Sequence, residues 1–270
     1  MRRAGFYIVL GAAAVVFLYP FLWMAGTSLK PPAEVGGLSF LPDSPTLENY
    51  RLMWVRAPFG RALLNSLLVA TVITLSVLVF GSAAAYALAR LRFPGRRILN
   101  ALTVAVLLVP AQLTLIPTYT LIVELGWVDS YAALIVPFAF NAMAILILRQ
   151  FFLQVPRSLM DAARLDGMGE LRILFTVFWP LAAAPLATVG ILTFMGAWNE
   201  VLWPLLVVRD EELMTLPQLL TVFSLGGGAG PRQLATKLAA AMVLVVPVVA
   251  AYAFLQRYFI ESMASTGIKG

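Results

Sequence analysis

Long apolar stretches without charge alternate with short polar segments along the whole chain. A transmembrane helix needs about 20 consecutive, mostly apolar residues, and six stretches are long enough. They run from Ala4 to Leu29, Ala62 to Ala89, Ile98 to Val123, Ser130 to Leu148, Ile173 to Asn199 with a continuation to Val208, and Leu238 to Gln256. The pattern therefore predicts an all-α integral membrane protein with six transmembrane helices.

The first stretch follows two basic residues, Arg2 and Arg3, as the core of a signal peptide would. A signal core has only about 7 to 15 apolar residues, and this stretch is far longer. We therefore interpret it as an uncleaved first span.

Composition agrees with a membrane protein, since 61% of the 270 residues are hydrophobic and 12% are charged. Cysteine and histidine are both absent. Their absence excludes disulfides, thiolate or imidazole metal sites, and histidine proton relays or triads. We expect no metal site and no cofactor bound by this chain.

Charge distribution predicts the orientation of the chain. The net charge of +6 could suggest a nucleic-acid partner, but the basic residues lie in short loops between apolar stretches. With the N-terminus inside, most of them fall on the cytoplasmic side, where lysine and arginine concentrate. We therefore expect no nucleic-acid partner, and we expect both termini and the turn Arg90 to Arg97 to be cytoplasmic.

The segment from Pro156 to Pro185 is rich in charge although apolar stretches flank it. Ser158 followed by Asp161 is a capping-box pattern, so a helix of about two turns is predicted from Leu159. Gly167 is a natural left-handed stop. Such a short helix is marginal alone, so it either docks against a partner or lies on the lipid surface.

A family resemblance favours docking. Asp161-Ala162-Ala163, three residues, Gly167, nine residues and then Val177 to Pro180 resemble the EAA motif of ABC importer permeases, E-A-A-x3-G-x9-I-x-L-P. Three positions depart from it, with Asp161 for Glu, Val177 for Ile and Trp179 for Leu. In that family the motif forms a coupling helix in a groove of a separate ATPase subunit. The resemblance assigns this role to Asp161, Ala162, Ala163, Asp166 and Gly167.

Other segments resemble the maltose-type, carbohydrate-uptake branch of the family. They are RQFF from Arg149, WNE ending at Glu200, and the C-terminal tail, which in that branch reaches between the ATPase subunits. The resemblance implies a type I ABC importer permease fold. It divides the chain into a first helix and extracytoplasmic loop (1–61), a permease core (62–260, with the EAA loop at about 156–180) and a cytoplasmic tail (261–270).

The implied function is that of a permease subunit in an ATP-driven sugar importer of a bacterial or archaeal cell membrane. Its implied partners are a second permease in a heterodimer, two ATPase subunits and an extracytoplasmic sugar-binding protein, with membrane lipid around them. No G-x-x-x-x-G-K-[ST] loop occurs, so ATP and Mg²⁺ would be bound by the ATPase partners. Near relatives also carry glycerol-3-phosphate and polyols, which leaves those substrates as an alternative.

Four polar residues within apolar stretches are candidates for the translocation path: Gln112, Asn141, Asn199 and Glu200. The amides could bind sugar hydroxyls, or they could hold helices together. Glu200 could have a functional role, since an intramembrane carboxylate is costly, or it could lie at the outer interface and pair with Arg209. It is also the residue on which an ion-coupled transporter, a less favoured alternative, would depend. A membrane enzyme would find almost no catalytic groups in this chain.

Overall fold

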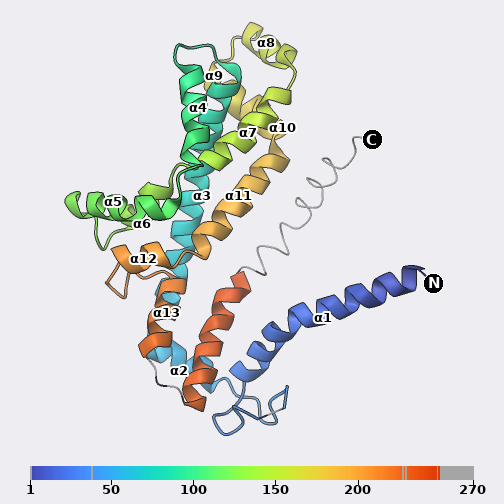
Figure 1. Cartoon of the computed structure of the whole chain (residues 1–270), viewed down its shortest axis with the longest axis vertical. Coiled ribbons are helices and arrows are strands. Elements are labelled where there is room, and N and C mark those ends of the chain that lie inside the picture. The colour runs from blue at the N-terminus through green and yellow to red at the C-terminus, as the bar shows by residue number, and fades with distance from the viewer. Residues whose placement is uncertain (1, 38, 227, 229, 248, 250–270) are drawn as a thin grey trace.

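The computed structural model describes residues 2–37, 39–226, 228, 230–247 and 249, and every regular element in these ranges is helical (Figure 1). The α-helices are α1 (Arg2–Ser28), α2 (Glu48–Arg56), α3 (Phe59–Arg90), α4 (Arg96–Val106), α5 (Ala111–Glu124), α6 (Tyr131–Ile135), α7 (Ala142–Gln154), α8 (Arg157–Leu165), α9 (Glu170–Ile173), α10 (Trp179–Leu181), α11 (Ala183–Trp198), α12 (Leu202–Val207) and α13 (Leu216–Gly226). A 3₁₀ turn, Val136–Phe138, and a π-helical turn, Leu174–Phe178, lie between them. Residues 231–247 form a further helix.

Within these ranges, α1 and α3 are each long and apolar enough to cross a membrane as one helix. Three further predicted spans are pairs of helices with a bend between them: α4 with α5 (103°), α6 with α7 (41°), and the α9–α10 segment with α11 (90°). The sixth predicted span, Leu238 to Gln256, and the tail 261–270 lie partly or wholly outside the described residues. The expectation of apolar membrane helices is confirmed, but most of them are not straight.

Proline explains where these helices break. Proline has no backbone N–H, so Pro110 cannot bond to the carbonyl of Val106, the last residue of α4. In the same way Pro185 cannot bond to Leu181, and the helix breaks at Ala182. The third and fifth spans, each predicted as one stretch, are therefore divided by a bend.

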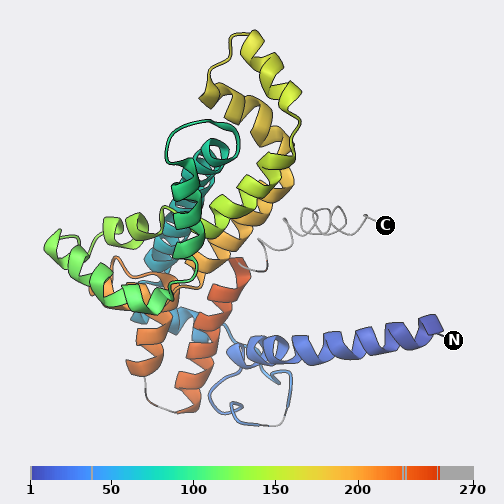
Figure 2. The ribbon, with the colours of Figure 1, turned by 45° about the horizontal axis from the view of Figure 1, so that its top comes forward.

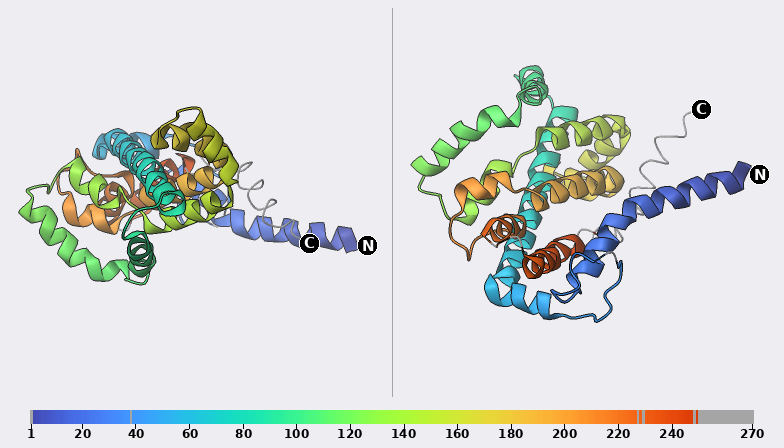
Figure 3. Two further views of the ribbon diagram at one scale, coloured as in Figure 1. Left: turned by 90° about the horizontal axis from the view of Figure 1, so that it is seen from above. Right: turned by 60° about the horizontal axis from the view of Figure 1, so that its bottom comes forward.

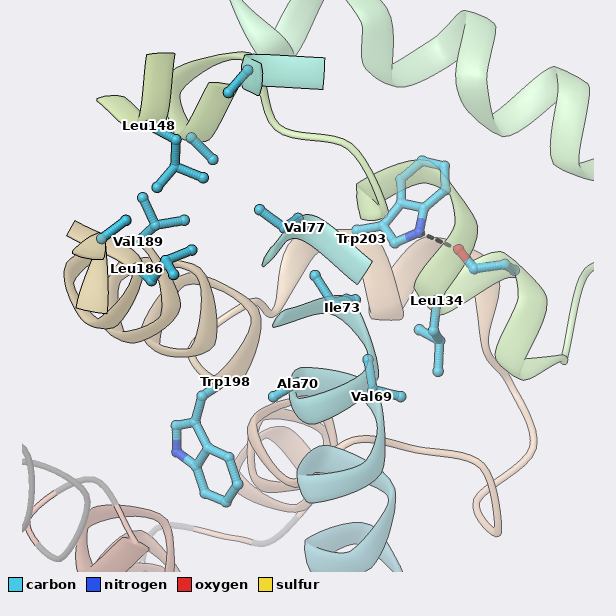
Figure 4. Packing of buried hydrophobic residues seen from close by; sticks show 14 of the residues in the cluster. Val69, Ala70, Ile73, Val77, Leu134, Leu148, Leu186, Val189, Trp198 and Trp203 are labelled. Atoms are coloured by element: carbon cyan, nitrogen blue, oxygen red, sulfur yellow. Dashed lines mark hydrogen bonds between the residues drawn. The ribbon is translucent and has the colours of Figure 1, made fainter. Parts of the chain in front are cut away.

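Helix α3 is the centre of the fold and packs most extensively against α7 and α11. Its apolar positions Val69, Ile73 and Val77 recur every four residues and so share one face. They are buried against three other elements, represented by Leu134 of α6, Leu148 of α7, and Leu186 and Val189 of α11 (Figure 4). At one end of this core, Trp203 of α12 donates a hydrogen bond to the carbonyl of Ala133 at 2.8 Å.

Helix α3 begins earlier than predicted. The apolar stretch was predicted from Ala62, but the helix starts at Phe59, and the polar residues Asn65 and Ser66 lie buried inside it. They bind the backbone that precedes α13: Asn65 Nδ2 donates to the carbonyl of Met214, and Ser66 Oγ accepts from the N–H of Leu216. Buried partners for two polar side chains allow the helix to run through this point.

The turn before α6 is held in a similar way. Asp129 Oδ1 accepts hydrogen bonds from the backbone N–H groups of Arg209 (2.5 Å) and Asp210 (3.0 Å). These donors lower the pKa of the Asp129 carboxyl. Asp129 thereby joins the α5–α6 turn to the segment after α12.

Helix α1 extends away from the other helices in every view (Figures 1, 2 and 3). An 18-residue apolar window of this helix is not buried against the rest of the chain, and only its last turn, with Thr27 and Ser28, is buried. Such a face is suited to lipid or to another apolar helix.

Candidate functional site

Helix α8 lies at one extreme of the molecule, opposite α2 and α13 (Figure 1). Only Met160 and Ala163 of this helix are buried, and they attach it to the remainder of the chain. The predicted coupling residues Asp161, Ala162, Asp166 and Gly167 are exposed, whereas Ala163 is part of the buried side. Leu165, also in α8, is 90% exposed.

Gly167 ends the helix with φ +76°, as predicted, in the left-handed region that glycine adopts without strain. The Met168 N–H, one residue later, returns to the carbonyl of Ala163 at 3.0 Å. This bond completes a C-terminal turn that redirects the chain toward α9.

The predicted capping box is wrong. The helix begins at Arg157 after an N-cap at Pro156, so Ser158 lies inside its first turn, and no side chain caps it. Pro156 has ψ 137° and ends the extended segment, after which nothing prevents Arg157 and Ser158 from adopting helical dihedral angles. Asp161 instead approaches Arg164, at 3.9 Å.

The end of the EAA segment is packed on α3. Phe178 is fully buried, and its ring lies edge to face with Tyr86 at 4.9 Å between centroids. Trp179 Nε1 donates to Ser82 Oγ at 2.9 Å. The tryptophan that departs from the family motif therefore has a specific partner, since a buried indole N–H needs an acceptor.

A hollow of about 620 Å³ separates α8 from the α3–α4 turn. Five arginines line it together with Asp161: Arg90, Arg92, Arg96, Arg157 and Arg164. Two of these arginines donate hydrogen bonds to backbone carbonyls. Arg96 donates to three carbonyls at the end of α3, and Arg90 donates to the carbonyls of Phe152 and Val155. Arg90 therefore ties α3 to the end of α7, and Arg96 ties the α3–α4 turn to the end of α3.

A second cavity, of about 240 Å³, opens between α3, α6, α11 and α12, and Asn141, Phe140 and Leu192 at its rim are exposed. Asn141 and Glu200, two of the four candidates for the translocation path, line it together. Phe138, Phe140 and Trp203 supply aromatic walls. A mostly apolar cavity with a few convergent polar groups is the usual form of a small-molecule site.

Each of these two polar side chains also accepts a hydrogen bond from a backbone N–H in the first turn of a helix. Asn141 Oδ1 caps α7 by accepting from the N–H of Ala144 at 3.0 Å, and Glu200 Oε1 accepts from the N–H of Trp203 at 3.0 Å. Among the described residues, Asn141 Nδ2 and Glu200 Oε2 have no protein partner, so they are available to a ligand. Glu200 and Arg209 form no ion pair in the described part of the chain, so the suggested pairing at the outer interface is not observed.

The other two candidates lie elsewhere. Gln112 is exposed on α5, and Asn199 is exposed at the end of α11, where its Nδ2 bonds to the carbonyl of Met195. Sequence reasoning missed Thr193 and Thr215, whose hydroxyls join the cavity lining. Thr215 Oγ1 is buried without a hydrogen-bond partner. A threonine in an apolar stretch is too common to be noticed before the fold is known.

Comparisons with known proteins agree with this arrangement. Residues 77–265 match the family described as "Binding-protein-dependent transport system inner membrane component". An arabinooligosaccharides transport system permease protein, AraQ of Halalkalibacterium halodurans, is 33% identical over 97% of this chain and 96% of its own length. The sn-glycerol-3-phosphate transport system permease protein UgpE of Shigella flexneri is 32% identical over 96% of this chain and 94% of its own length.

A solved structure has the same fold. It is a bacterial ABC transporter involved in the import of the acidic polysaccharide alginate, and one of its chains gives a TM-score of 0.85 at 26% identity. The match covers 96% of this chain and 97% of that one. With its all-helical architecture and exposed EAA helix, the chain therefore belongs to the inner membrane components of binding-protein-dependent transport systems and has the type I ABC importer permease fold.

Proposed function

We propose that this chain is one of two permease subunits of an ATP-driven carbohydrate importer in a bacterial or archaeal cell membrane. It works with a second, different permease, two ATPase subunits and an extracytoplasmic binding protein. The observation that carries the proposal is α8, a short helix anchored on one side by Met160 and Ala163 and exposed on the other.

The exposed side of α8 suits a groove in an ATPase. Asp161, Ala162 and Leu165 offer one carboxylate, one small residue and one large apolar side chain to a partner. The sequence has no P-loop, so ATP is bound by the ATPase subunits, and this chain contributes no ATP site of its own. Closure of the ATPase pair moves α8, and the helices attached to it follow as a rigid body.

The cavity between α3, α6, α11 and α12 belongs to the translocation path in this proposal. Among the described residues that line it, Glu200 alone is ionisable and none is a lysine or an arginine. A carboxylate accepts hydrogen bonds from hydroxyl groups but repels anions, while aromatic walls cover the apolar faces of a sugar ring. These features favour a neutral carbohydrate over a phosphate ester or an acidic sugar.

Reconstituted transport tests both parts of the proposal. The chain, its partner permease, the ATPase and the binding protein encoded beside it are assembled in proteoliposomes. Uptake of a neutral oligosaccharide, glycerol-3-phosphate and an acidic oligosaccharide is then compared. We expect uptake of the neutral sugar, driven by ATP and unaffected by ionophores that collapse ion gradients. Uptake of only the anionic compounds would contradict the substrate class, and dependence on an ion gradient instead of ATP would contradict the transporter class.

A further inference from the structure

A shared carboxylate lies between α8 and α3. Arg164 of α8 makes two contacts to Glu170 Oε1, from Nε at 2.9 Å and from Nη2 at 2.8 Å. The other carboxylate oxygen, Glu170 Oε2, accepts a hydrogen bond of 2.5 Å from the Tyr86 hydroxyl of α3. Each oxygen of one side chain therefore serves a different helix.

Tyr86 is a rigid support for this contact. Its side chain is 3% exposed, and its ring lies edge to face with Phe178 at 4.9 Å and with Phe152 at 6.5 Å. Aromatic packing on two sides leaves the hydroxyl little freedom, and a buried tyrosine hydroxyl requires a partner. That partner is Glu170, 84 residues away in the chain.

Both contacts involve the Glu170 carboxylate, but the Tyr86 contact is partly buried, whereas the Arg164–Glu170 pair is 40% exposed on each side and is screened by water. Hydrogen bonds to an ionised group are shorter and roughly twice as strong as those between neutral groups. Along the described part of the chain, Arg164–Glu170–Tyr86 is the path of side-chain hydrogen bonds that leads from α8 to α3. The other attachments of α8, through the buried Met160 and Ala163, are apolar and carry no side-chain hydrogen bond.

From this geometry we infer that Glu170 is a positioning residue that fixes the angle of α8 relative to α3 and so passes movement of the coupling helix into the membrane core. The inference rests on the proposed function, since it requires an ATPase bound to α8. Glu170 is half-buried, whereas Asp161, Ala162 and Leu165 are exposed, and Glu170 is linked to Asp161 only through Arg164, which approaches Asp161 at 3.9 Å. Loss of the contact should therefore uncouple the transporter while the subunits remain assembled.

The variants separate coupling from folding. Tyr86→Phe removes one hydroxyl and keeps the ring that packs on Phe178, and Glu170→Gln removes the charge and keeps the shape. Tyr7→Phe is the matched control, because Tyr7 is 67% exposed on α1 and its hydroxyl makes no hydrogen bond within the described residues. Each variant is purified with its partner permease and ATPase and reconstituted with the binding protein.

Three quantities are measured: the amount of ATPase that co-purifies, the basal ATPase rate, and substrate transported per ATP hydrolysed. We expect unchanged co-purification and basal rate, and a fall in transport per ATP of about 3- to 10-fold, within the range for mutations along a coupled network. The double variant should be no worse than either single one, because both remove the same connection. Tyr7→Phe should match the wild type.

Two results would overturn the inference. One is normal transport per ATP in both Tyr86→Phe and Glu170→Gln. The other is loss of ATPase from these variants, which would make the contact part of docking or folding. Failure of the wild-type chain to bind any ATPase would instead contradict the proposed function, so the two failures are distinguishable.

Discussion

Gly167 acts through its backbone conformation alone, since an added Cβ there would meet no other atom within 4 Å. Its φ of +76° could be predicted from the sequence because few residues other than glycine end a helix in this way. The cap predicted from Ser158 and Asp161 is wrong, because the proline before the helix lets the helix begin earlier than the motif indicates. The Tyr86–Glu170 hydrogen bond could not be predicted from the sequence either, because it joins residues that only the folded chain brings together.

The first residue-scale prediction concerns Gly167→Val. A β-branched residue at positive φ costs about 1–2 kcal/mol and would rotate the end of α8. We expect normal membrane insertion, weaker co-purification of the ATPase and loss of uptake.

The neighbouring glycine provides the control for this prediction. Gly169 has φ −73° and open space around it, so Gly169→Val should be tolerated. Gly167→Asn should keep part of the activity, because asparagine adopts the left-handed region more readily than valine. A Gly167→Val protein that binds its ATPase and transports normally would remove the coupling role of α8.

At the scale of elements, the positions of prolines in the sequence predict where helices break, but they do not predict the angle between the two halves. Pro110 and Pro185 explain why helices end at Val106 and Leu181. The bends of 103° and 90° depend on what each half packs against, and that information is spread over the whole chain. The same holds for the cavity. Two of its polar residues could be singled out in the sequence, whereas its threonines and aromatic residues could be identified only from the folded structure.

Asn141 provides an element-scale prediction, because it both caps α7 and lines the cavity. Asn141→Ala removes the cap and the free amide, and should cost about 1 kcal/mol of stability as well as raising the KM for uptake. Asn141→Asp keeps an acceptor for the N–H of Ala144 but replaces the amide donor with a second carboxylate near Glu200. It should raise KM with little loss of thermal stability.

Ser130→Ala controls for the cap alone. Ser130 Oγ accepts from the N–H of Ala133 at the start of α6, but Ser130 does not line the cavity. It should lower the melting temperature and leave KM unchanged. If Asn141→Ala and Ser130→Ala behave alike in transport, Asn141 is a capping residue only.

At the scale of the whole molecule, composition and charge-free stretches were enough to predict a helical membrane protein. They gave no sign that α1 would stand apart from the other helices or that α4 and α5 would meet at a steep angle. Neither feature could be read from the positions of the apolar stretches, because those positions do not say which stretches contact one another.

Orientation in the membrane provides the whole-molecule prediction. The chain has no cysteine, so single cysteines can be introduced at Leu165, which is 90% exposed on α8, and at Gly228. The excess of arginine on the side of α8 predicts that this side is cytoplasmic. A membrane-impermeant maleimide added to intact cells should label position 228, and position 165 only after the membrane is permeabilised. The reverse labelling would invert the topology.

The length of α3 has a mechanical consequence. At about 1.5 Å per residue its 32 residues reach about 48 Å, more than the roughly 30 Å of the hydrocarbon layer. One end is tied to Glu170 through Tyr86, and the other is tied through Asn65 and Ser66 to the segment that precedes α13. The 20 residues between Ser66 and Tyr86 place these two contacts about 30 Å apart on one continuous helix. A displacement at the Glu170 end therefore has an uninterrupted helix along which it can reach the segment beside α13.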